Sequence, residues 1–285
     1  IYLVKSKKYK SFKLGTLPDI SVFMYACIFV IFSILLLTFS VAIISPPNNW
    51  DSMAYHMGRV VHWIQNESVA HYPTNITRQL YNPPWAEYAI MHFQILSGGD
   101  RFANLVQWLS MVGSVIVVTL IAQELGGTTR SQVMSAIVAL TIPMGILQST
   151  STQNDYVVSF WLSCFVYFGL LHKNVPNLQN TLGLGSSLAL AILTKGTAYI
   201  YALPFILLFA GAWLKYSRRK FVAQALLVAV LVVGINSGHF IRNYKIWGNP
   251  ISTDTEKLTN DAYGPFILIS TIIRNIALHI DTPIE

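Results

Sequence analysis

Ionisable side chains that could take part in acid–base chemistry stand beside or inside apolar segments at three places in the sequence. They are Asp51 in WDSMAYHMGRVVHW, Asp155 in TSTQNDYVVSFW and Lys195 in LTKGTAYIYALP. A charged group at membrane depth costs at least about 2.5–3.5 kcal/mol on insertion scales, so such groups usually pair or face a water-filled cavity. Two interpretations stay open for Asp155 and Lys195: a structural ion pair between helices or, together with Asp51, part of a polar site.

The stretch that holds Asp51 predicts an amphipathic helix. On a period of 3.6 residues, one stripe is polar and contains Asp51, Tyr55, Arg59 and His62. The opposite stripe is apolar and contains Trp50, Ala54, Met57, Val61 and Ile64. Asn48 or Asn49 can cap the start of the helix, and Pro46-Pro47 ends the segment before it. We expect this helix to lie flat on the membrane surface, with its polar face turned away from lipid.

A long loop follows, HYPTNITRQLYNPPWAEYAIMH, which is rich in aromatic and ionisable residues such as Arg78 and Glu87. A loop of this kind is more often functional than a plain connector. The residues of this region that could bind a divalent metal are His56, His62, His71, His92, Glu67 and Glu87. The sequence has no HxH or HExxH spacing there, so we expect neither a metal nor another cofactor.

The composition indicates a membrane protein. Of the 285 residues, 53% are hydrophobic and 11% are charged, whereas soluble domains carry roughly 25% charged residues. Cys27 and Cys164 both lie in apolar runs, which indicates neither a disulfide framework nor a zinc site. The net charge of +7 does not indicate nucleic acid, because the basic runs KSKKYKSFK and KYSRRK flank apolar segments, as cytoplasmic anchors do.

The predicted fold is an all-α polytopic membrane protein, since a spanning helix needs roughly 20 mostly apolar residues. The candidate spans, about seven, are residues 20–45, 102–123, 131–149, 155–172, 181–197, 199–214 and 220–241. They form one transmembrane domain, 1–285, with an outer loop, 46–101, and an outer segment, 242–285. The apolar stretch 264–280 is either an interfacial helix or the start of a further span. The distribution of basic residues predicts a cytoplasmic N-terminus, and we expect this chain to be the N-terminal part of a longer protein.

Four stretches, in this order, resemble the GT-C glycosyltransferases, and more narrowly the family-39-type branch of protein mannosyltransferases and aminoarabinose transferases. They are WDSMAYHMGRVVHW, TSTQNDYVVSFW, LTKGTAYIYALP and IRNYKIWGNP, and they are distributed from residue 50 to residue 250, so the resemblance extends over most of the chain. Some relatives carry an adjacent acidic pair where this chain has the lone acid of Trp-Asp-Ser. The class of acceptor therefore stays open.

The resemblance implies a GT-C-type bundle with interfacial helices in its first outer loop. It also implies inverting transfer of a sugar from a polyprenyl-phosphate carrier to an acceptor hydroxyl on the outer face. Asp51 matches the family's first-loop acid and is implied as the general base, while Asp155 matches a second acid that orients the acceptor or a cation. The candidate substrate-binding residues are Tyr55, His56, Arg59, Arg78, Glu87, Lys195 and Arg242. The cations among them would stabilise the phosphate that leaves.

Two other classes of protein stay open: a transporter or flippase of lipid-linked glycans, and a non-catalytic membrane subunit. Transporter folds often have duplicated halves, and this sequence shows no internal repeat. The expected partners are the bilayer, a lipid-borne sugar donor and a lipid, glycan or protein acceptor, but not nucleic acid. We expect the chain in a bacterial inner membrane, with its active site facing the periplasm or the exterior.

Overall fold

Helices make up all the secondary structure in the residues that the computed structural model describes, which are 21–216, 218–251 and 263–280. Four helices of this described part are long and apolar enough to cross a bilayer: α1 (Val22–Ile44), α5 (Leu105–Glu124), α8 (Asp155–Asn174) and most of α11 (Arg218–Trp247). The predicted fold class, an all-α polytopic membrane protein, is confirmed. The N-terminal basic run and residues 252–262 of the predicted outer segment lie outside the described residues.

Shorter helices occupy the other predicted spans. The helices α9 (Leu178–Thr194) and α10 (Ala198–Tyr216) are separated at Lys195, where the backbone is extended. The segment 131–149, predicted as one helix, is two: α6 (Thr129–Leu140) and α7 (Pro143–Gln148). Pro143 explains the break, because the residue before a proline avoids the helical conformation. The number of membrane crossings stays a prediction.

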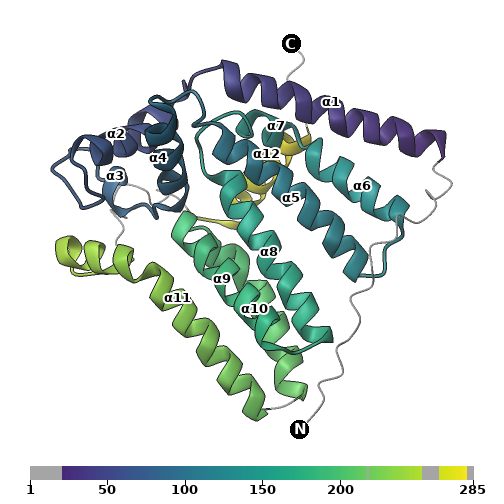
Figure 1. Ribbon diagram of the computed structural model, residues 1–285. Coiled ribbons are helices and arrows are strands. Elements are labelled where there is room, and N and C mark those ends of the chain that lie inside the picture. The colour runs from purple at the N-terminus through teal and green to yellow at the C-terminus, as the bar shows by residue number, and fades with distance from the viewer. Residues whose placement is uncertain (1–20, 217, 252–262, 281–285) are drawn as a thin grey trace, which may run out of the picture.

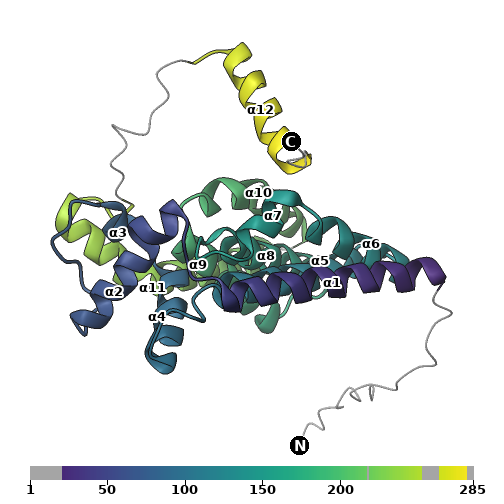
Figure 2. The same ribbon diagram turned by 90° about the horizontal axis from the view of Figure 1, so that it is seen from above.

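The helix α11 is longer than the predicted span 220–241. It continues over Arg242, which was expected at the start of an outer segment, and ends at Trp247 before Gly248, whose φ is 65°. A left-handed glycine commonly ends a helix in this way. The apolar stretch near the C-terminus forms a further helix, α12 (Pro265–Ile280), which lies near α7 and apart from the main bundle (Figure 2).

The first outer loop is mostly helical. A π-helical turn, Ser52–His56, leads into α2 (Met57–Gln65), and the short α3 (Arg78–Tyr81) and α4 (Trp85–Ser97) follow. Interfacial helices were expected in this loop from the family resemblance, but the bounds of α3 and α4 were not predicted. Figure 1 shows these loop helices gathered at one end of the bundle, next to the end of α11. Met57, Ile90, Val106 and Val157 form a core that fixes α2 and α4 on α5 and α8.

A second core joins α8, α9 and α10 to α11, around the buried side chains of Phe165, Leu188 and Phe209. Gly185 lets α9 approach α11 closely: a Cβ atom at this position would lie 2.6 Å from Leu231 Cδ1 and 3.3 Å from Val228 Cα. Small residues at helix contacts are the usual means of close packing in membranes, where van der Waals contact drives association.

We predict that Gly185→Val lowers the free energy of unfolding by about 1–3 kcal/mol, the usual cost of overpacking a filled interior. The matched control is Gly234→Val on α11, since a Cβ at Gly234 meets nothing within 4 Å. Chemical denaturation of both variants in micelles measures the difference. Equal stability of the two variants would contradict the packing described for Gly185.

Candidate active site

The helix that carries Asp51 differs in register from the predicted amphipathic helix. Asn49 caps its start as expected, with Oδ1 accepting from the backbone N of Ser52 at 2.8 Å. The π-helical turn then changes which side chains share a face, because its hydrogen bonds span five residues instead of four. Arg59, expected on the outward polar stripe, is only 1% exposed, whereas Trp50, on the predicted apolar stripe, is 81% exposed.

Asp51 is half-buried and contacts two polar side chains. The Tyr55 hydroxyl donates to its carboxylate, and Gln153 Nε2 lies 3.5 Å from its Oδ2 atom. Burial raises the pKa of Tyr55 most, and the negative charge and hydrogen bond of Asp51 raise it further. Tyr55 therefore keeps its proton at any physiological pH and acts as a fixed donor to Asp51.

Asp155 and Lys195 form an ion pair, with 2.6 Å between Lys195 Nζ and Asp155 Oδ1. Their side chains are 45% and 34% exposed, so water reaches both charges. The pair joins the first residue of α8 to the residue that follows α9. Beside it, Asn154 Nδ2 donates to the carbonyl oxygen of Thr194 at 3.0 Å, which holds the same two helix ends together.

The start of α8 is also tied to α5. Gln107 Oε1 accepts from the backbone N atoms of Tyr156 and Val157, at 3.0 and 3.2 Å. The first amide groups of a helix have no hydrogen-bond partner within the helix. The Gln107 side chain provides that partner for α8, as a capping residue would. Gln107 thereby fixes the position from which Asp155 projects.

The three residues singled out first in the sequence meet at this point. Gln153 contacts Asp51, and Asp155, two residues further on, pairs with Lys195. Arg78 adds a second cation nearby, with its exposed guanidinium 6.0 Å from the centre of the Tyr55 ring. The candidate site therefore contains two carboxylates, two cations, a phenol and an amide.

A buried charge cluster lies behind this site. His56 Nδ1 is 2.6 Å from Glu87 Oε1, and Arg59 Nη1 is 3.7 Å from the same oxygen. Burial alone would raise the pKa of Glu87, but the charge of Arg59 and the hydrogen bond and charge of His56 lower it. Glu87 is thus a carboxylate buried inside the loop; its Oε1 atom meets His56 and Arg59, whereas Oε2 has no hydrogen-bond partner among the described residues.

Arg59 joins this cluster to α3. Its guanidinium donates to the backbone carbonyls of Gln79, Arg78 and Asn82, the last two at 3.1 and 2.8 Å. These bonds set where the Arg78 side chain emerges. His56, Arg59 and Glu87 were predicted to bind substrate; their burial gives them a positioning role, and direct contact with substrate stays a prediction.

Arg242 belongs to another group of side chains, where the end of α11 meets the loop. Its Nη2 donates to the Tyr88 hydroxyl at 2.7 Å. The neighbouring Asn243 side chain contacts His71 and His239, each at 3.2 Å, and so fastens the loop to α11. The predicted role of Arg242 in binding the donor also stays a prediction.

The described part of the chain contains no group of three His, Cys, Asp or Glu side chains that could hold a metal ion. His56 and Glu87 offer two ligands, but Arg59 occupies the space beside them.

Three polar residues of the site, Gln107, Gln153 and Asn154, were not among the predicted site residues. A signal for Gln107 was present, because a polar residue inside an apolar span usually has a specific partner.

Comparison with protein families identifies the chain. Residues 81–237 match the model described as dolichyl-phosphate-mannose-protein mannosyltransferase. The chain belongs to this family. It is an integral membrane glycosyltransferase of the GT-C type, as the four stretches predicted, and the family acts in a membrane context on a lipid-linked sugar donor. Searches among curated proteins and among solved structures found no match. The match includes Glu87, Asp155 and Lys195, while Asp51 lies upstream of it.

We predict that Glu87→Gln lowers the free energy of unfolding by about 3 kcal/mol or more at neutral pH, because it leaves the buried charge of Arg59 without its counter-charge. The pKa of Glu87 is lower in the folded state than the ordinary value of about 4.3. Its stabilisation is therefore complete above pH 4.3 and is lost as the pH falls through the lowered folded value. Denaturation of both forms from pH 3 to 7 measures the difference.

Glu67→Gln is the matched control, since Glu67 is exposed in the same loop. Its stability should follow the wild type at every pH. A Glu87→Gln variant as stable as the wild type at pH 7 would mean that the buried cluster does not hold the loop.

Proposed function

We propose that this glycosyltransferase moves a sugar from a polyprenyl-phosphate donor to an acceptor hydroxyl at the outer face of the membrane, with inversion at the anomeric carbon and with Asp51 as general base. One observation carries the proposal: Asp51 and the Asp155–Lys195 pair meet through the segment 153–155. Acidic and basic groups from three distant parts of the sequence thus lie at one end of a helical bundle. A donor held by its lipid tail has access to such a place.

The surroundings of Asp51 suit a base. The acceptor oxygen would attack the anomeric carbon, its proton would pass to Asp51, and the bond from that carbon to the phosphate oxygen would break. An aspartate does this efficiently when it is oriented and partly removed from water. Tyr55 and Gln153 orient Asp51 from two sides and leave it half-buried.

The cations suit the leaving group. Polyprenyl phosphate departs with the electron pair of the broken bond, and Lys195 and Arg78 are placed to stabilise the developing charge. Because the Lys195–Asp155 pair is half-exposed, the donor phosphate can replace Asp155 as the partner of Lys195. Asp155 would then be free to orient the acceptor.

The outer face is assigned from charge. The site lies at the start of α8, and the basic run KYSRRK lies between α10 and α11, near the end of the bundle where α8 finishes. Basic runs stay on the cytoplasmic side, so the site would face outward, into the periplasm if the membrane is a bacterial inner membrane.

The first test is turnover of the full-length protein in proteoliposomes with a panel of polyprenyl-phosphate sugars. We predict that Asp51→Asn lowers kcat about 10²–10⁴-fold, the usual contribution of a general base, while donor binding survives. Asp100→Asn, an exposed acid at the end of the same loop, is the control and should leave turnover unchanged. Full turnover by Asp51→Asn would show that Asp51 is not the general base. If the protein binds none of the sugar donors, a transporter or a non-catalytic subunit would be favoured.

A second prediction separates a phosphate-binding Lys195 from a structural one. Lys195→Gln should raise the KM for the sugar donor and lower kcat about 100-fold, since the cation that stabilises the developing charge of the phosphate is lost. Lys195→Arg keeps a cation at this position and should restore much of the lost kcat and of the KM. Lys245→Gln, exposed on α11, serves as control. If Lys195→Gln loses stability but keeps the wild-type kcat and KM, then the pair with Asp155 is structural only.

A further inference from the structure

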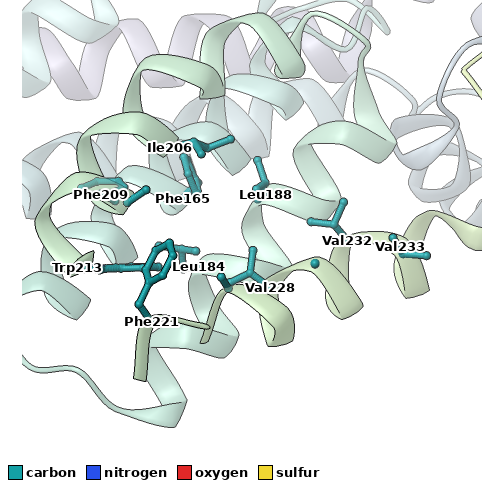
Figure 3. Close-up of a pocket in the computed structure, with 13 residues that line it drawn as sticks. Phe165, Leu184, Leu188, Ile206, Phe209, Trp213, Phe221, Val228, Val232 and Val233 are labelled. Carbon is teal, nitrogen blue, oxygen red and sulfur yellow. The ribbon is translucent and has the colours of Figure 1, made fainter. Parts of the chain in front are cut away.

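A cavity of about 350 Å³ lies between α8, α9, α10 and α11, away from the candidate site (Figure 3). Its floor is formed by the buried side chains of Phe165, Leu188 and Phe209, and α11 supplies one wall through Val228 and Val232. All the side chains around it are hydrocarbon apart from one indole. An apolar cavity of this kind stays free of water and takes apolar molecules.

The cavity is long and opens sideways. Phe221 and Val233 line opposite ends of its α11 wall, and twelve residues of helix between them correspond to about 18 Å. Val233 and Ile206, which also line it, are 60% and 38% exposed, so the cavity opens toward the surface that faces lipid. A hydrocarbon chain fits this shape better than a compact ligand does.

One end of the cavity is polar. Figure 3 shows Trp213 beside Phe221 at this end, and Trp213 Nε1 is buried without a hydrogen-bond partner among the described residues. The Trp213 ring packs on His172, with 4.4 Å between ring centres, and His172 contacts Gln224 at 3.1 Å. An indole N–H can only donate, so an ester carbonyl or a phosphate oxygen would satisfy it.

The exposed side chain of Lys173 carries a positive charge at the same end, and further basic residues follow the lining residue Trp213 in the sequence. Four of the six residues from 215 to 220 are basic, and this run connects the lining residues Trp213 and Phe221 in the sequence. Lys173, exposed in the last turn of α8, follows His172 directly. Basic groups between transmembrane helices on the cytoplasmic side attract anionic lipid head groups.

We propose that this cavity binds one acyl chain of an anionic phospholipid from the inner leaflet, with the lipid head group at the basic end beside Trp213. The lipid site is distinct from the donor site, because α8 runs about 26 Å from Asp155 at one end of the bundle to His172 at the other. A donor tail would enter from the opposite end, which lies far from the exposed Lys173 and from the indole N–H of Trp213.

Quenching of Trp213 fluorescence by brominated lipids tests the proposal directly. The full-length protein and its Trp213→Phe variant are reconstituted in phosphatidylcholine vesicles that contain increasing fractions of brominated phosphatidylglycerol or brominated phosphatidylcholine. The difference between the two proteins isolates Trp213. We expect brominated phosphatidylglycerol to quench the Trp213 fluorescence obtained in this way at a several-fold lower fraction of the lipid than brominated phosphatidylcholine does.

Two variants of α11 provide the matched control. Ala225 lines the cavity and Ala223 is exposed outside it, so Ala225→Phe should abolish the preference and Ala223→Phe should keep it. Equal quenching by both lipids, or an unchanged preference in Ala225→Phe, would overturn the proposal. Relief of the quenching by polyprenyl phosphate, but not by unbrominated phosphatidylglycerol, would overturn it in favour of the donor tail.

Discussion

The buried charge of Arg59 constrains the whole first outer loop. Its guanidinium is removed from water, and a charge buried without partners costs more than a fold can supply. The carbonyls of Arg78, Gln79 and Asn82, in or directly after α3, and the carboxylate of Glu87, in α4, provide its partners. Arg59 of α2 thereby links three helices. A loop that must bring all of these around one side chain has few alternative arrangements, so α2, α3 and α4 are held together as one unit.

The same unit is what carries Asp51 to the start of α8. Apolar contacts of α2 and α4 with α5 and α8 bring the two parts together, and polar side chains then set the register. Gln107 and Asn154 satisfy backbone groups at the ends of α8 and α9 that apolar surroundings would leave unpaired. Gln153 spans the gap between this bundle end and Asp51.

The fold class could be predicted from the sequence, because apolar length acts locally. For Asp155 and Lys195 the sequence left two arrangements open, a structural ion pair or a polar site shared with Asp51. The spans 181–197 and 199–214 were predicted as two separate helices, but their break was placed three residues after the one observed at Lys195. The break at Pro143 was not predicted, because the residues directly beside it, Ile142 and Met144, are apolar. The burial of Arg59 could not be predicted from helical periodicity, since a π-helical turn shifts the register and its partners lie about 20 residues away in the chain. Gln153 gave no periodic signal, because it stands in a connection between helices.

The charge cluster of the loop and the ion pair at the end of the bundle differ in how easily one of their charged partners can be replaced by another ion. The Glu87 cluster is enclosed, so removing any partner strands a buried charge. The Asp155–Lys195 pair is half-exposed, and pairs of that kind contribute only about 0–1 kcal/mol because water competes for both ions. An enzyme that must capture a lipid phosphate needs a cation whose resting partner is easily displaced, and a rigid support that does not respond when the displacement occurs. In the proposed mechanism the end of the bundle would supply the displaceable cation and the loop would supply the rigid support, which would account for the different burial of the two clusters.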